Sequence, residues 1–81
     1  MKVKIRLDTL SDIRGFIESV DGIADEVRLT DGNNLTVSAK SLLGVMYTME
    51  WREVYCTCNR DIYGYIEKYV SEGDCDERLD G

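Results

Sequence analysis

Four short segments in which every second residue is apolar constrain the fold of this 81-residue chain more than any other feature. They lie at residues 2–7, 26–30, 35–39 and 51–58. Alternation of this kind places apolar side chains on one face of a strand and polar side chains on the other. Because each strand then has one apolar face, the sequence predicts a four-stranded sheet that is covered on one side and exposed to solvent on the other.

The first helix is predicted directly after the first strand. Beyond Thr9 the apolar residues return every three or four positions, which is the spacing of one face of a helix. They are Leu10, Ile13, Phe16, Ile17 and Val20. Thr9 followed by Asp12 has the form of a capping box, and Gly22 is a stop signal. Gly15 in the helix interior costs about 1 kcal/mol relative to alanine, so we expect it to mark a place of close packing.

Two further helices are expected in the second half of the chain. Ser41 can cap a short helix over residues 42–46, and Asn59 can cap a last helix with a second apolar stripe. The residues of that stripe are Ile62, Tyr65, Ile66, Tyr69 and Val70. Asp-Gly-Asn-Asn at residues 31–34 predicts the turn of a hairpin between the second and third strands. Gly73 is the expected stop of the last helix.

The predicted order of elements is therefore βαββαβα. We expect one α+β domain over residues 1–73, an open-faced sandwich in which three helices cover one face of a four-stranded antiparallel sheet. Residues 74–81 are acidic and poor in apolar side chains, so they are expected to fray. The uncovered face of the sheet is predicted to carry Lys2, Lys4, Arg6, Arg28, Thr30, Thr36, Ser38, Tyr55 and Thr57.

The charge balance excludes some classes of partner. The net charge is −6, and nucleic acids and anionic membranes are bound mainly through lysine and arginine, so neither is expected as a partner. No stretch approaches the 18 or more apolar residues of a membrane span, and residues 1–4 do not begin a signal peptide. Three cysteines without a secretory signal fit a reducing compartment, and a cytoplasmic location is therefore predicted.

No residue set predicts catalysis, a cofactor or a metal site. The chain has no histidine, and it has neither a nucleophile–base pair nor a glycine-rich phosphate loop. Cys56 and Cys58 project to one face of a strand and are interpreted as small buried hydrophobes, while Cys75 is expected to be exposed. The tyrosines and Trp51 are scattered over strand and helix segments, which favours packing over base stacking. The protein is therefore predicted not to be an enzyme.

The segment at residues 37–46 reads Val-Ser-Ala-Lys-Ser-Leu-Leu-Gly-Val-Met. It resembles the segment around the regulatory serine of HPr, the small phosphocarrier of the bacterial sugar phosphotransferase system. The likeness extends to the order of elements over about residues 1–72. It implies the HPr-like fold, phosphorylation of Ser41 by an HPr kinase, and binding of a transcriptional regulator. The neighbouring contact residues would be Lys40, Leu42, Leu43 and Met46.

The same resemblance breaks at the carrier site. The family has Gly-Ile-His-Ala-Arg-Pro between the first strand and the first helix, whereas residues 7–12 here are Leu-Asp-Thr-Leu-Ser-Asp. Because the histidine, arginine and proline are missing, no position inherits the phosphocarrier role. A paralogue without this histidine, the catabolite-repression HPr, is known in the family. The resemblance therefore implies a regulatory member without carrier activity.

The predicted function is a regulatory protein–protein interaction in phosphotransferase or carbon metabolism, switched by phosphorylation of Ser41. Three alternatives stay open from the residues. Ser41 can be an N-cap and nothing more, and two of Leu42, Leu43 and Met46 can belong to the core. The chain can also be a dimerising structural paralogue of HPr without phosphorylation, since a shortened loop favours strand exchange. The third alternative is a phosphocarrier that uses another residue. The oligomer is predicted to be a monomer or a homodimer.

Overall fold

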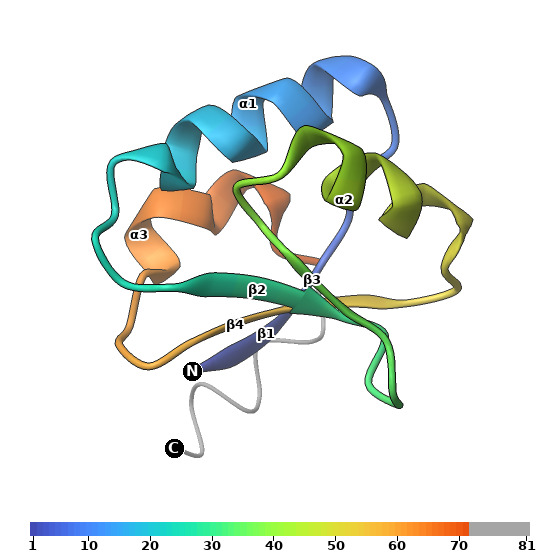
Figure 1. Ribbon diagram of the computed structural model, residues 1–81. Coiled ribbons are helices and arrows are strands. Elements are labelled where there is room, and N and C mark those ends of the chain that lie inside the picture. Colours follow the sequence, from blue (N-terminus) through green and yellow to red (C-terminus); the bar gives the residue numbers. More distant parts are fainter. Residues whose placement is uncertain (72–81) are drawn as a thin grey trace.

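The computed structural model describes residues 1–71 and shows an α+β fold (Figure 1). A four-stranded antiparallel sheet and three short helices, which the sequence predicts, are confirmed. In chain order the elements are β1 (Lys2–Ile5), α1 (Leu10–Asp21), β2 (Val27–Thr30), β3 (Thr36–Ser38), α2 (Leu42–Tyr47), the 3₁₀ helix η1 (Thr48–Glu50), β4 (Val54–Cys58), α3 (Tyr63–Ile66) and the 3₁₀ helix η2 (Glu67–Tyr69). The predicted stop at Gly73 and the acidic segment 74–81, including Cys75, lie outside the described residues.

The strands lie in the order β1-β4-β2-β3, and every neighbouring pair is antiparallel. Cys56 at the middle of β4 is opposite Val3 of β1 on one side and Leu29 of β2 on the other. All three helices lie over the same face of this sheet, and the opposite face has no helix on it (Figure 1). The hydrophobic core therefore lies between the sheet and the helices.

The predicted alternation of buried and accessible side chains is confirmed along β1 and β4. Val3, Ile5 and Leu7 are buried, and the intervening lysine and arginine side chains are not. Along β4, the buried residues are Val54 and the two cysteines, again at every second position. None of the nine residues predicted for the uncovered face is buried. The period of two along each strand thus places a single apolar layer under the helices.

Helix α1 begins and ends where the sequence predicts. The Thr9 hydroxyl accepts from the Asp12 backbone N–H at 3.0 Å, and the Asp12 carboxylate accepts from the Thr9 N–H at 3.2 Å, so the capping box is present. The helix ends at the Gly22 cap. Leu10 differs from the prediction, because its side chain is 57% exposed rather than part of the buried stripe. It is the first residue of the helix.

The hairpin between β2 and β3 is present but its second strand is short. Gly32 has a φ of +83°, which only glycine adopts without strain, as expected of this turn. Of the inward-facing residues predicted for the return strand, Ala39 is buried and Val37 half-buried, whereas Leu35 is exposed. Leu35 lies between the turn and the first residue of β3, Thr36.

Two predicted boundaries in the second half are wrong. The strand predicted from residue 51 begins only at Val54, because the chain first forms η1 after α2. Asn59 does not cap the last helix; α3 starts at Tyr63 with Ile62 at the cap position and no side-chain cap. The helical stripe is also interrupted, since Tyr65 is exposed.

The end of the described chain pairs with the outer edge of β1. The Arg6 backbone N–H donates to the Tyr69 carbonyl at 2.8 Å, and the Ser71 N–H donates to the Lys4 carbonyl at 2.9 Å. Val70 forms an isolated antiparallel bridge with Ile5. Val70 therefore leaves the helical stripe in which the sequence places it, because two backbone hydrogen bonds to β1 hold it extended.

Candidate functional site

Ser41 lies at the start of α2, where the sequence predicts a cap. Its backbone is extended, and its Oγ accepts a hydrogen bond from the Gly44 N–H at 3.1 Å. The residue is exposed to solvent. The hydroxyl therefore has a structural role as the N-cap and is at the same time reachable from outside.

The apolar side chains of α2 point mostly away from the core. Val45 alone among them is fully buried. The accessible ones are Leu42 (51% exposed), Leu43 (80%), Met46 (38%) and Tyr47 (49%). We call these four residues the α2 patch. The open alternative that two of the three predicted contact residues belong to the core is wrong, because none of them is buried.

Lys40, the fourth predicted contact residue, is already engaged. Its ammonium donates to the Ile23 carbonyl in the connection that follows α1, and its side chain is half-buried. The contact joins the β3–α2 turn to the α1–β2 connection. Lys40 therefore has a structural contact within the protein, and its predicted contact with a partner stays a prediction.

Trp51 adjoins the α2 patch. Its ring meets the Tyr47 ring edge-on, with ring centres 5.8 Å apart and planes at 78°. Trp51 is half-buried and packs against the core cluster from its margin. Tyr47 was not predicted as a contact residue, although its place directly after the predicted helix could have suggested it. The patch is therefore continuous with an aromatic pair that joins α2 to the chain leading into β4.

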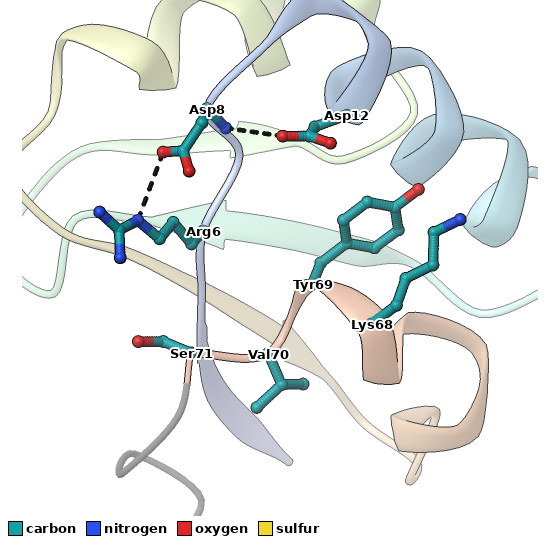
Figure 2. Close-up of a pocket in the computed structure, with 7 residues that line it drawn as sticks. All are labelled: Arg6, Asp8, Asp12, Lys68, Tyr69, Val70 and Ser71. Carbon is teal, nitrogen blue, oxygen red and sulfur yellow. Dashed lines mark hydrogen bonds and ion pairs between the residues drawn. The ribbon is translucent and has the colours of Figure 1, made fainter.

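A cavity of about 570 Å³ lies on another side, where the β1–α1 connection meets the end of the described chain (Figure 2). Its lining comes from both ends of the sequence, so sequence patterns could not have identified it. The lining residues are Arg6, Asp8, Asp12, Lys68, Tyr69, Val70 and Ser71.

Three of the four charged side chains that line this cavity have polar partners on the β1–α1 connection. Arg6 Nε pairs with an Asp8 carboxylate oxygen at 3.3 Å, and the Asp12 carboxylate accepts from the Asp8 N–H at 3.1 Å as well as completing the α1 cap. Figure 2 shows the Arg6 and Lys68 side chains extending to opposite sides, so the two cations do not converge on one point. Neither histidine nor cysteine is among the lining residues of this cavity.

Cys56 and Cys58 are free thiols in the core, as the sequence predicts. Burial, and to a smaller extent the neighbouring Cys58, raise the pKa of Cys56 to about 12. Only the thiolate is strongly nucleophilic, so neither the geometry nor the ionisation favours reaction at neutral pH.

We therefore expect iodoacetamide to leave Cys56 and Cys58 unmodified in the native protein at pH 7.5, while both are alkylated in denaturant. Mass spectrometry of the peptides that contain residues 54–60 measures this. Rapid native labelling of Cys56 would contradict its placement in the core.

The described residues contain neither a metal-binding cluster nor a membrane-spanning helix. Within residues 1–71, no three cysteine, aspartate or glutamate side chains gather closely enough to hold a metal ion. In the same part of the chain, no helix has the length and apolar character needed to cross a membrane.

Comparison with known proteins gives no match for this chain among family models, curated proteins or solved structures.

Proposed function

We propose that this protein is an HPr-like regulatory module that acts by binding another protein through the α2 patch. The observation that carries the proposal is the exposure of four apolar side chains on one six-residue helix. Contiguous exposed apolar side chains are uncommon on proteins that act alone and frequently mark an interaction surface. Methionine and tyrosine are also residue types that suit such surfaces.

Phosphorylation of Ser41 is the proposed switch. A phosphoserine carries about −1.5 to −2 charges at neutral pH and three strong acceptor oxygens. In the unmodified protein the Gly44 N–H donates a hydrogen bond to the Ser41 hydroxyl at 3.1 Å. After phosphorylation the same N–H can donate to a phosphate oxygen, so the start of the helix need not unfold. The modification would place a compact anion beside Leu42 and Leu43. A partner with a cation next to an apolar surface would then be favoured, and one with only an apolar surface would be disfavoured.

The switch is tested by intact mass after incubation with ATP and an HPr kinase. We expect the wild-type protein to gain one phosphate and Ser41→Ala to gain none. Ser11→Ala is the matched control, because Ser11 is also exposed near the start of a helix but lies in α1. Equal phosphorylation of Ser41→Ala and wild type would place the modification elsewhere, and no phosphorylation of either would contradict the switch.

The same exposed patch favours one alternative, a homodimer without phosphorylation. Sedimentation velocity at two protein concentrations separates the two functions. A mass that rises with concentration, and that Leu43→Lys returns to the monomer, would support self-association through α2. A monomer at both concentrations would leave a different protein as the partner of the patch.

A further inference from the structure

The outer side of β3 is an open edge of the sheet (Figure 1). β3 is the last strand in the order β1-β4-β2-β3, so β2 pairs with only one of its two sides. In an antiparallel pair, residues directly opposite each other alternate between pairs that exchange hydrogen bonds and pairs that do not. The Ala39 N–H donates to the Val27 carbonyl at 2.9 Å, and the Asp31 N–H donates to the Leu35 carbonyl at 3.2 Å. These two bonds establish which residues of β3 face β2 with their backbone groups.

The register leaves backbone groups of two residues pointing outward. Val37 belongs to the same set as Leu35 and Ala39, whereas Thr36 and Ser38 belong to the alternate set. The N–H and C=O groups of Thr36 and Ser38 therefore point away from β2, and both residues are exposed. Within residues 1–71, the Ser38 carbonyl alone among these four groups has a backbone partner, the Ser41 N–H at 3.2 Å. The edge thus offers two donors and one acceptor to another strand.

The segment around this edge lacks the charges that usually keep strands of different molecules apart. Open edges in natural proteins are commonly protected by charged side chains, by proline or by being short. Residues 32–39 contain neither a charged residue nor a proline, although the chain as a whole has a net charge of −6. Of these three devices β3 has only shortness, with three residues. A second copy of the chain therefore meets no like charge along this segment.

The edge is also complementary to itself. When two copies pair antiparallel about Thr36, the N–H of each Thr36 donates to the carbonyl of the other. The same register places Leu35 of one copy opposite Val37 of the other. Leu35 is 40% exposed in the single chain, and Val37 is half-buried. Because side chains of directly opposite residues contact each other, the pairing covers a leucine that the single chain leaves accessible.

We propose that two copies of this protein pair through the outer edges of their β3 strands, so that the two sheets join into one continuous sheet. The occupant of the edge is a second copy because a single register satisfies the Thr36 backbone groups and covers Leu35 at the same time. The strand is short, so the dimer is weak and forms at high protein concentration. This inference goes beyond the proposed function, because the contact is made by the β3 edge and not by Ser41 or the side chains of the α2 patch.

The first test follows the backbone amides of the full-length protein in ¹⁵N-correlated NMR spectra at micromolar and millimolar concentrations. We expect the Thr36 and Ser38 peaks to shift with concentration and their exchange with solvent to slow, because both N–H groups become bonded to the second copy. The amides of β1, at the opposite edge of the sheet, are the internal reference and should not change. Unchanged Thr36 and Ser38 amides, or a monomer mass by sedimentation at millimolar concentration, would overturn this inference and leave the α2 patch proposal unaffected.

The variant Thr36→Pro tests the pairing directly. Proline removes an N–H that no hydrogen bond within residues 1–71 uses, and edge strands tolerate it at such positions. We expect Thr36→Pro to be folded and to be a monomer at millimolar concentration, whereas the matched control Thr36→Val keeps the N–H and still dimerises.

A second variant keeps the test decisive if Thr36→Pro does not fold. Leu35→Lys changes a residue that is already exposed and places a charge opposite Val37 of the second copy, so it should also abolish the dimer. A dimer that persists in both Thr36→Pro and Leu35→Lys would contradict the proposal. If Leu43→Lys abolished that dimer, the association would belong to the α2 patch instead.

Discussion

Replacing Phe16 by alanine is expected to lower the free energy of unfolding by about 3–5 kcal/mol, the usual cost of removing a large buried ring. Phe16 is fully buried in α1 and meets the Tyr69 ring edge-on, with centres 5.7 Å apart. A domain of 81 residues has a total stability of only about 4–12 kcal/mol. The variant should therefore be close to unfolding at 25 °C, as urea denaturation followed by circular dichroism would show.

Leu43→Ala is the matched control for this loss. Leu43 is 80% exposed, so its removal from α2 is expected to change stability by no more than about 0.5 kcal/mol. A conservative Phe16→Leu change should cost less than Phe16→Ala, because it leaves a smaller cavity. If Leu43→Ala were as costly as Phe16→Ala, the leucine would have to be covered in solution, and the α2 patch would not be accessible as described.

The contrast between these two positions bears on the proposed function. Stability requires an apolar side chain at position 16 and does not require one at position 43. An exposed leucine beside the Ser41 cap is thus available for binding. Variants at Leu43 can test binding because they are expected to stay folded. A variant at a core position could lose binding simply by unfolding.

The parts of the fold that the sequence predicts correctly depend on local patterns. Alternation along residues 2–7 needs only the period of the strand, and the capping box needs only Thr9 and Asp12 three positions apart. Ser41 is a correctly predicted cap for the same reason. In each case the atoms that interact are within one turn of helix or on one face of one strand, so no knowledge of distant contacts is necessary.

The errors occur where distant segments decide the local structure. Val70 fits a helical stripe by spacing, but hydrogen bonds with β1 place it in an extended bridge to Ile5. Leu10 fits the stripe of α1, but its side chain is exposed. Neither outcome is determined by the residues that surround these positions in sequence.

The candidate sites also differ in whether local sequence or distant contacts determine them. The α2 patch comes from one continuous segment, and its leading residues could be identified from that segment. The cavity of about 570 Å³ requires residues from the β1–α1 connection and residues 68–71 at the other end of the described chain. Arg6 and Lys68 are far apart in sequence, so no local pattern indicates that both line one cavity.

Gly15→Ala is the second large effect that we expect, and its direction is opposite to helix propensity. Alanine stabilises a helix interior by about 1 kcal/mol relative to glycine. A Cβ at position 15 would, however, overlap the Tyr69 hydroxyl, and the Tyr69 ring is buried against Phe16. Overpacking of this kind typically costs about 1–3 kcal/mol. Gly64→Ala is the control, since nothing lies within 4 Å of a Cβ there.

The double variant Gly15→Ala/Tyr69→Phe shows whether the hydroxyl is the cause. Without it the nearest atom to the new Cβ is the ring carbon that bore the hydroxyl, at 3.5 Å, which is an ordinary contact. We expect the double variant to recover the stability lost in Gly15→Ala and to exceed Tyr69→Phe by up to about 1 kcal/mol, the gain from helix propensity. Urea denaturation of the four proteins in this cycle gives the coupling between the two positions. Additive effects would mean that Gly15 is not in contact with Tyr69, and that α1 and η2 pack at a greater distance.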